Sequence, residues 1–358
     1  MTEPFDQSIA ARLRLLFGDR TILTSLQPLA GDASSRRYYR AVLQGPSAPP
    51  SAVIMQVPAG ASLPLSSEEL AVFKEPPKEL PFLNLHRFLA RLGVRIPRLY
   101  GSWEREGILV LEDLGDVCLW DRVQGLPASD VELWYRKAID VLLRLQIGGT
   151  ARPDESCLAF QQRFDFRLYM WEFDHFLEYG LEKRPGGNFS RAAAEQLRSA
   201  FKEIARCLDA LPPCLNHRDY HSWNLMVRGE EIVVIDFQDA LLAPAPYDLA
   251  SLLNDRETDR VITAGLERNL LGYYLQRSEE MGAPRGGPDE FLRFYLLSAI
   301  QRDFKVVGRF YYLDLVKGKP AYRKFIPPTL RRLRRNLARL PETEALIPLL
   351  AESYEEMR

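Results

Sequence analysis

The chain has 358 residues, of which 46% are hydrophobic and 27% are charged, and its formal net charge is −1. This composition is typical of a globular protein, and the near-neutral charge excludes a global attraction to nucleic acid or to a membrane surface. The length is comfortable for two domains, each of which can bury a core of its own.

The cysteines and the apolar runs indicate the compartment. The four cysteines contain no CxxC pair: Cys118, Cys157, Cys207 and Cys214. This pattern favours reduced, mostly buried thiols over a disulfide framework or a thiolate metal site. No segment reaches the ~18 apolar residues that span a bilayer, and the first residues lack the pattern of a signal peptide. We therefore expect a cytoplasmic protein.

The first 115 residues predict a small unit that mixes strands and helices. Apolar spacing predicts a helix at 7–17, and Pro, Ser and Glu make 58–80 irregular. Three β-rich runs between 21 and 57 predict antiparallel strands, and an amphipathic helix at 83–93 ends at Gly93. Two more strands follow, at 98–103 and 107–115.

The remainder of the chain is helical in pattern. Helix-period segments occur near 130–147, 163–182, 190–210, 258–280, 289–310 and 329–340. One β-like stretch, 225–237, interrupts them and contains a turn. The shift in pattern predicts an α+β protein with a β-rich N-lobe at 1–114 and a mostly helical C-lobe at 115–358. A ligand cleft is expected where two lobes meet.

Three polar residues near the strand-like stretch suggest phosphoryl transfer. Asp219 lies in NHRDYHSWN, Asn224 follows five residues later, and Asp236 ends the apolar run IVVI. A carboxylate can accept the proton of a bound hydroxyl. An amide oxygen and a second carboxylate suit Mg²⁺, which prefers oxygen ligands. Each residue alone is explained as a turn or capping residue, but their joint spacing favours the catalytic interpretation.

These motifs resemble those of a known superfamily. HRDYHSWN fits the kinase catalytic-loop pattern, and IDFQD stands where the kinase DFG segment stands. His221 and the later YDLASLL look like the aminoglycoside phosphotransferase and choline kinase superfamily. Four further stretches resemble bacterial anomeric kinases of N-acetylmuramate and N-acetylglucosamine: 29–40, 109–116, 234–255 and 301–310. The resemblance runs from about residue 26 to residue 340 and implies a bilobal, protein-kinase-like fold.

The resemblance implies roles for individual residues. Asp219 would be the catalytic base, and Asn224 and Asp236 would hold Mg²⁺. The backbone of Glu112 to Leu114 would bind adenine. The residues expected around the ATP phosphates are Gly31, Ser34, Ser35, Arg36 and Arg37. The two arginines are included because the third strand has Met55 where kinases usually carry a lysine, and arginine binds phosphate oxygens with two hydrogen bonds.

Five residues are candidates for contact with the acceptor substrate: His221, Gln238, Asp239, Arg302 and Lys305. Arg302 and Lys305 lie three residues apart and share a helix face, which in the simplest interpretation is exposed to solvent. The resemblance to the anomeric kinases raises an alternative, in which these two residues approach an acidic lactyl group of the substrate. His217 and His221 have a spacing that can bind zinc, but no third ligand stands nearby, so we expect His217 to shape the loop instead.

Two further features receive structural interpretations. Asp248 is expected to cap a helix and to brace the catalytic loop. Residues 329–340 form a basic run in which leucines repeat at helical spacing, so the leucines are expected to face the protein and the arginines to face outward. A nucleic-acid patch is the alternative, but the run has no interleaved aromatic residues.

The sequence therefore predicts an ATP- and Mg²⁺-dependent kinase whose acceptor is a small molecule, in first place an amino sugar of cell-wall recycling. We expect a monomer without nucleic-acid or membrane partners. Kinases of aminoglycosides, choline or other alcohols are alternatives, and so is a pseudokinase without activity, which the missing strand lysine suggests. An aminoglycoside pocket would need carboxylates, and a choline pocket would need aromatic faces.

Overall fold

The computed structural model describes residues 5–29, 36–57, 79–186 and 189–358. Its contacts divide the chain into two compact units, each treated separately below. The sheet unit contains the described residues of Met1–Ser66 and Ile96–Val117, and the helical unit contains those of Ser67–Arg95 and Cys118–Arg358. The predicted phosphate-loop residues Gly31, Ser34 and Ser35, and nearly all of the segment predicted to be irregular, lie outside the described residues.

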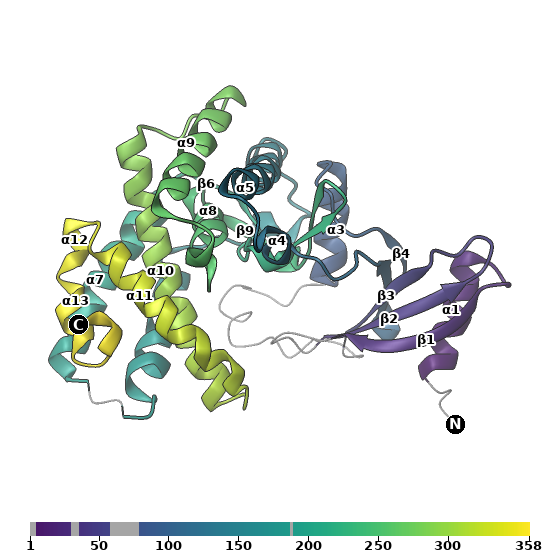
Figure 1. The fold of residues 1–358 in the computed structure, drawn as a ribbon, viewed down its shortest axis with the longest axis horizontal. Helices are drawn as coiled ribbons and strands as arrows, with labels where there is room; N and C mark the ends of the chain where they lie inside the picture. The colour runs from purple at the N-terminus through teal and green to yellow at the C-terminus, as the bar shows by residue number, and fades with distance from the viewer. Residues whose placement is uncertain (1–4, 30–35, 58–78, 187–188) are drawn as a thin grey trace. The chain divides into compact units, whose positions relative to one another are not determined.

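The sheet unit is built on one antiparallel sheet of five strands in the order β1-β2-β3-β5-β4 (Figure 1). The strands are β1 (Ile22–Leu29), β2 (Arg37–Gln44), β3 (Ser51–Gln56), β4 (Leu99–Trp103) and β5 (Ile108–Glu112). This confirms the three strands and the later pair that the sequence predicts. The last two strands pair with each other, and β5 also pairs with β3, so the late pair extends the early sheet.

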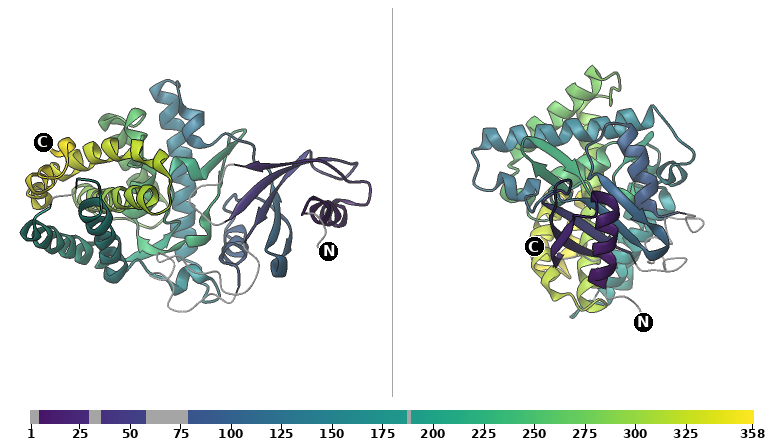
Figure 2. Two further views of the ribbon diagram at one scale, coloured as in Figure 1. Left: turned by 90° about the horizontal axis from the view of Figure 1, so that it is seen from below. Right: turned by 90° about the vertical axis from the view of Figure 1, so that its right-hand side faces the viewer.

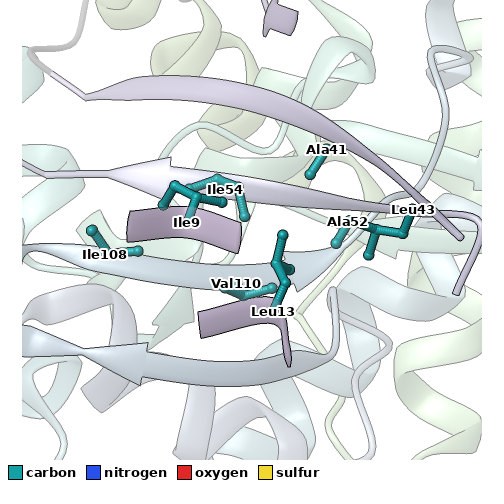
Figure 3. Close-up of a cluster of buried hydrophobic side chains, with 8 residues drawn as sticks. All are labelled: Ile9, Leu13, Ala41, Leu43, Ala52, Ile54, Ile108 and Val110. Carbon is teal, nitrogen blue, oxygen red and sulfur yellow. The ribbon is translucent and has the colours of Figure 1, made fainter. Parts of the chain in front are cut away.

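Helix α1 (Phe5–Phe17) covers one face of this sheet (Figures 1 and 2). Its buried residues Ile9 and Leu13 pack on alternate residues of three strands: Ala41, Leu43, Ala52, Ile54, Ile108 and Val110 (Figure 3). Side chains of a strand alternate between the two faces of a sheet. The apolar residues that alternate along the strands and those that recur at helical spacing in α1 therefore form one apolar core.

The helical unit is arranged around one long helix, α10 (Pro288–Leu315) (Figure 1). Its larger helices are α3 (Pro81–Arg91), α5 (Ala128–Leu143), α6 (Phe166–His175), α7 (Arg191–Asp209), α8 (Pro246–Leu253), α9 (Ala264–Glu280) and α11 (Ile326–Leu337). The shorter ones are α4 (Leu119–Val123), α12 (Pro341–Glu344) and α13 (Leu346–Ala351). Helices α6, α7, α8 and α11 all pack against α10. Sixteen residues of α10 are buried, as expected for a helix surrounded by others.

Two short antiparallel pairs position the polar motif. Strand β6 (Pro213–Asn216) pairs with β9 (Leu241–Pro244), and β7 (Leu225–Arg228) pairs with β8 (Glu231–Val234). The β7–β8 hairpin confirms the strand-like stretch and turn that the sequence predicts. The segment NHRDYHSWN therefore connects β6 to β7, and the second motif connects β8 to β9. Both motifs leave the ends of buried strands, which fix their backbones.

One sequence interpretation is wrong at an important position. The arginines of α11 were expected to face outward, but Arg332 is 1% exposed, as is Asp303 of α10, with which it forms an ion pair. The neighbouring Arg331, Arg334 and Arg335 are exposed, as predicted. The buried arginine is possible because an aspartate on the facing helix neutralises it.

The thiols agree with the prediction. All four cysteines are free, and Cys118, Cys157 and Cys214 are buried. In the part of the chain that the structure describes, no helix is long and apolar enough to cross a membrane.

Candidate active site

The loop after β6 is held in a strained conformation by two neighbours. Arg218 has a φ of 80°, a region that residues with a side chain rarely occupy. Its N–H donates to Asp248 Oδ1 at 3.0 Å, and its carbonyl oxygen accepts from Arg302 Nη1 at 2.8 Å. The N–H of His217 donates to the other oxygen of Asp248. Asp248 thus braces the loop, as predicted, and burial raises its pKa to about 6.

His217 links this loop to the second motif. The N–H of Asp219 donates to its Nδ1 at 3.3 Å, so the ring proton is on Nε2, which donates to the carbonyl oxygen of Ile235 at 2.8 Å. The ring is fully buried. This confirms the structural role predicted for His217. No group of three or more His, Cys, Asp or Glu side chains suited to a metal occurs among the described residues.

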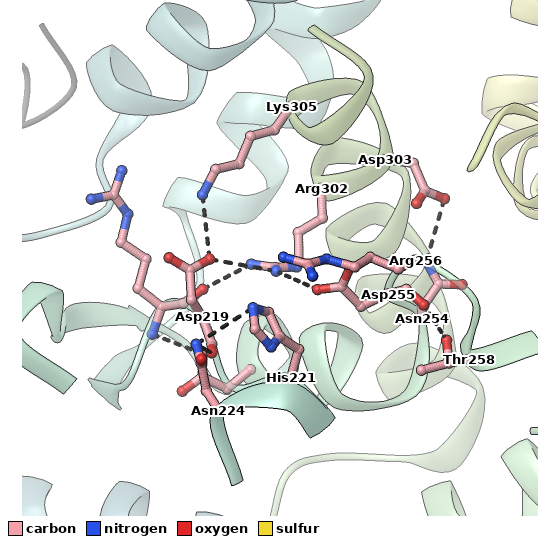
Figure 4. A network of polar contacts seen from close by, with 12 residues as sticks. Asp219, His221, Asn224, Asn254, Asp255, Arg256, Thr258, Arg302, Asp303 and Lys305 are labelled. Atoms are coloured by element: carbon pink, nitrogen blue, oxygen red, sulfur yellow. Dashed lines mark hydrogen bonds and ion pairs between the residues drawn. The ribbon is translucent and has the colours of Figure 1, made fainter. Parts of the chain in front are cut away.

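Asp219 lies at the centre of a group of cations (Figure 4). Its carboxylate is 3.7 Å from Arg302 Nη2 and 3.8 Å from Lys305 Nζ, and 38% of its side chain is exposed. Burial alone would raise its pKa, but Lys305, Arg302 and Arg218 together hold that pKa far below the ordinary value. The carboxylate is therefore ionised throughout the physiological pH range.

A buried carboxylate, Glu172 of α6, contacts two of these cations, Arg218 and Lys305. It accepts from Arg218 at 3.4 Å and from Gln301 at 2.7 Å, and it lies 3.3 Å from Lys305 Nζ. Sequence reasoning missed it. The available signal was a charged residue on the apolar face of α6, at helical spacing from the buried Leu168.

Asn224 and Asp236 present the oxygens that Mg²⁺ prefers. Asn224 Nδ2 donates to the carbonyl oxygen of Asp219 at 2.9 Å, which leaves the side-chain oxygen Oδ1 as the acceptor end of the amide. Its backbone carbonyl accepts from Ile235 N–H at 3.0 Å, the residue before Asp236. Asp236 is exposed and has a φ of 62°. The donor set, an amide oxygen and a carboxylate, fits the ion.

The predicted substrate candidates fall into two groups. His221, Arg302 and Lys305 surround Asp219, and all three are at most 9% exposed. This overturns the simplest interpretation of Arg302 and Lys305 as a solvent-exposed face. Gln238 donates to both Asp236 and Asp239 at 2.9 Å. Gln238 and Asp239 therefore belong to the surroundings of the predicted metal ligand.

A second loop beside Asp219 was also missed by sequence reasoning. Asp255, which is 5% exposed, lies 3.6 Å from Arg302. The next residue, Arg256, has a φ of 31°, and its carbonyl oxygen accepts from the buried Arg332. Arg332 also donates twice to Asp303, at 3.1 and 2.6 Å. Helices α10 and α11 thus hold a loop that leads directly to the cations around Asp219.

Comparison with known proteins agrees with this geometry. A family model described as "Phosphotransferase enzyme family" matches residues 25–286, which is well over half of the chain. The chain belongs to this phosphotransferase family. The match includes the loop with Asp219 and Asn224 and the segment with Asp236, so the enzyme is a kinase by family.

Curated relatives of this phosphotransferase carry one name. A protein from Pseudomonas aeruginosa named "N-acetylmuramate/N-acetylglucosamine kinase" is 31% identical over 91% of this chain and 88% of its own. A protein of the same name from Neisseria meningitidis serogroup B is 30% identical over 90% and 89%. Both alignments extend well beyond residue 286, where the family match ends.

Solved structures support the fold of the phosphotransferase. Choline kinase LicA from Streptococcus pneumoniae has a TM-score of 0.59, with 15% identity over 92% of this chain and 99% of its own. Aminoglycoside phosphotransferase APH(2'')-Ib, solved with ADP bound, has a TM-score of 0.56, with 15% identity over 92% and 98%. The predicted protein-kinase-like fold, with a small sheet-rich part and a large helical part, is confirmed.

In the sheet unit of the phosphotransferase, side-chain contacts hold the linker that is predicted to bind adenine, Glu112 to Leu114. Asp113, between Glu112 and Leu114, forms an ion pair with Arg40 at 2.7 Å, and Arg40 also contacts Asp116 at 2.8 Å. The side chain of Glu112 accepts from Arg98 N–H at 3.1 Å. Sequence reasoning missed Arg40, whose pair with Asp113 fixes the backbone at this position.

The predicted phosphate-binding arginines lie where β2 begins. Arg36 precedes the strand and is half-buried, and Arg37 is its first residue and is exposed. Strand β3 contains no lysine, and Met55 in it is 1% exposed. The assignment of these arginines to the ATP phosphates stays a prediction.

Proposed function

We propose that this kinase transfers the γ-phosphoryl group of ATP to the anomeric C1 hydroxyl of N-acetylmuramate or N-acetylglucosamine, as a step of cell-wall recycling in the cytoplasm. The name shared by the curated relatives supports the sugar acceptor. The observation that carries the chemistry is the position of Asp219, whose carboxylate is partly exposed between two cations and whose backbone is tied to Asn224.

Asp219 would orient the acceptor hydroxyl and take its proton. A carboxylate with so low a pKa is a weak base, and it suits an acceptor whose proton leaves readily. The anomeric hydroxyl is part of a hemiacetal and is more acidic than an ordinary alcohol. Arg302 and Lys305 keep the carboxylate ionised and are proposed to stabilise negative charge near the transferred group.

The remaining residues would bind the nucleotide and its metal. Asn224 and Asp236 would hold Mg²⁺, which when bound neutralises charge on the triphosphate. Arg36 and Arg37 are proposed to bind phosphate oxygens, with the arginines replacing the absent strand lysine.

The charges beside Asp219 favour a neutral or acidic acceptor. Arg302 and Lys305 lie within 4 Å of the base, and a polycationic aminoglycoside would be repelled there. The nearby Trp223 already has two neighbours: Trp120 stacks on it with ring centroids 4.8 Å apart, and Arg256 lies 5.0 Å from its ring centroid, where the guanidinium would repel a quaternary ammonium. These contacts are unfavourable for aminoglycosides and for choline.

A coupled ATPase assay over a panel of acceptors tests the proposal. We expect turnover with N-acetylmuramate and N-acetylglucosamine, and none with choline or kanamycin. The methyl glycoside of N-acetylglucosamine lacks a free anomeric hydroxyl and should not be phosphorylated. Turnover of the methyl glycoside would refute phosphorylation at C1, and turnover of choline or kanamycin alone would refute the sugar acceptor.

The base is tested by Asp219→Asn. We expect kcat to fall by about 10²–10⁴-fold, because proton transfer to a positioned base contributes this much. Binding of ATP with Mg²⁺, measured by calorimetry, should be retained. Asp289→Asn, at an exposed position in the first turn of α10, is the matched control and should keep its activity. A normal kcat in Asp219→Asn would remove Asp219 from its role.

A further inference from the structure

The side chain of Arg256 is held between two aromatic rings at the edge of the site. Its guanidinium carbon lies 5.0 Å from the ring centroid of Trp223 and 5.8 Å from that of Phe325. Trp223 stacks in turn on Trp120, with ring centroids 4.8 Å apart. Stacking uses the faces of a guanidinium, whereas its five N–H groups lie in its plane and suit a planar carboxylate.

The backbone of Arg256 is strained. Its φ of 31° is unfavourable for any residue except glycine. A simple turn here would be served better by glycine, and strained residues gather at functional sites. The strain is maintained by Arg332, which donates to the carbonyl oxygen of Arg256 and is itself held by Asp303. The protein therefore uses a buried ion pair to keep an arginine in a costly conformation.

A chain of contacts connects Arg256 to Asp219, the proposed base. Arg302 lies 3.7 Å from Asp219 and 3.6 Å from Asp255. Its guanidinium therefore bridges the proposed base and the residue before Arg256. Trp223, on which Arg256 stacks, is next to the predicted metal ligand Asn224 and lies edge-on to His221 at 5.9 Å. Figure 4 shows Arg256 beside Asp255 and Arg302.

Arg256 differs from the other cations of the cluster in exposure. Arg302 and Lys305 are 3% and 9% exposed. Arg256 is half-buried, so that part of its side chain is exposed to solvent. A half-buried arginine with fixed faces loses little side-chain entropy when it binds.

We propose that Arg256 determines acceptor specificity by binding a carboxylate on the sugar, such as the lactyl group of N-acetylmuramate. This inference rests on the proposed function and deepens it. N-Acetylglucosamine lacks the carboxylate, so Arg256 discriminates between the two sugars, whereas Asp219 acts on both.

The test measures kcat/KM of wild type, Arg256→Ala and Arg256→Lys with three acceptors: N-acetylmuramate, its methyl ester and N-acetylglucosamine. For Arg256→Ala we expect the ratio of kcat/KM for N-acetylmuramate to that for N-acetylglucosamine to fall at least 10-fold, because a charge-assisted bond of two N–H groups is lost. The methyl ester should show no such fall. Arg256→Lys should give an intermediate ratio, because it keeps the charge but not the planar fork.

The matched control is Arg260→Ala at the other end of the same stack. Arg260 lies 6.0 Å from the Trp120 ring centroid, its side chain is 62% exposed, and it pairs with Glu257. Its removal should leave the ratio as in wild type. The role of Arg256 would be overturned if Arg256→Ala lowered kcat/KM equally for both sugars, or if it lowered kcat/KM for the methyl ester as much as for the acid. Either result would leave the proposed function standing. A wild-type enzyme that phosphorylates neither sugar would overturn the proposed function and this inference with it.

Discussion

Replacing Arg332 by methionine should destabilise the helical unit strongly. Arg332 and Asp303 are each 1% exposed and are joined by hydrogen bonds of 3.1 and 2.6 Å. Methionine keeps an unbranched apolar stem but leaves Asp303 charged and buried without its partner. Removing one partner of a buried ion pair costs about 3–5 kcal/mol, a large share of the roughly 5–15 kcal/mol that stabilise a domain.

Urea unfolding followed by tryptophan fluorescence measures this loss. Trp103 is the one tryptophan of the sheet unit among the five in the chain, so the signal reports mainly on the helical unit. With a dependence on urea of about 1–3 kcal/mol per molar, the midpoint of unfolding should fall by at least about 1 M. Arg331→Met, at an exposed position on the same helix, is the matched control and should change stability by less than about 0.5 kcal/mol.

A double variant separates the charge from the packing. Adding Asp303→Asn to Arg332→Met removes the stranded charge, while the new amide oxygen can still accept from Asn254 and Asn336, which donate to Asp303 at 3.3 and 3.4 Å. The double variant should therefore be more stable than Arg332→Met by about 1–3 kcal/mol, the cost of an unpaired buried group. The reasoning is refuted if the double variant is no more stable than the single one, or if Arg332→Met resembles its control.

Two further predictions concern stability. A Cβ at Gly308 would lie 2.8 Å from the Phe176 Cα, whereas one at Gly272 in α9 would meet nothing within 4 Å. In urea unfolding, the free energy of unfolding should fall by about 1–3 kcal/mol in Gly308→Ala and rise by about 0.5–1 kcal/mol in Gly272→Ala. Equal effects of the two substitutions would contradict the close packing at Gly308. Burial lowers the pKa of His221, so the unfolded chain binds a proton below about pH 6.5 that the folded protein does not. Between pH 6.5 and 5.5, the free energy of unfolding of wild type should therefore fall by up to about 1.4 kcal/mol more than that of His221→Gln. Equal losses in both proteins would contradict a neutral His221.

The catalytic loop was predictable because its parts are close in sequence. His217, Asp219 and Asn224 lie within eight residues, and a short loop between strands leaves them few arrangements. Periodicity also gave the sheet and the main helices, since each depends on residues only a few positions apart. The catalytic assignments themselves stay predictions, although the structure brings the predicted base, amide and cations together.

The partners of these residues could not be predicted in the same way. Glu172 contacts Arg218 across 46 positions, and Arg332 contacts Asp303 across 29. A charged residue on a helix is normally exposed, and only the position of its partner on another helix makes burial favourable. Helical spacing could show that Glu172 faces the core, but not which cation it meets there.

The family match and the site together suggest where acceptor specificity is encoded. The match ends at residue 286 and therefore includes Asp219, Asn224 and Asp236 but neither α10 nor α11. The cations that contact Asp219 come from α10, and the arginine that holds Arg256 comes from α11. The residues predicted to carry phosphoryl transfer, and Arg256 itself, thus lie within the family match. Two cations that contact Asp219, and the arginine that holds the backbone of Arg256, thus come from helices beyond the match, and we propose that these helices contribute to the choice of acceptor.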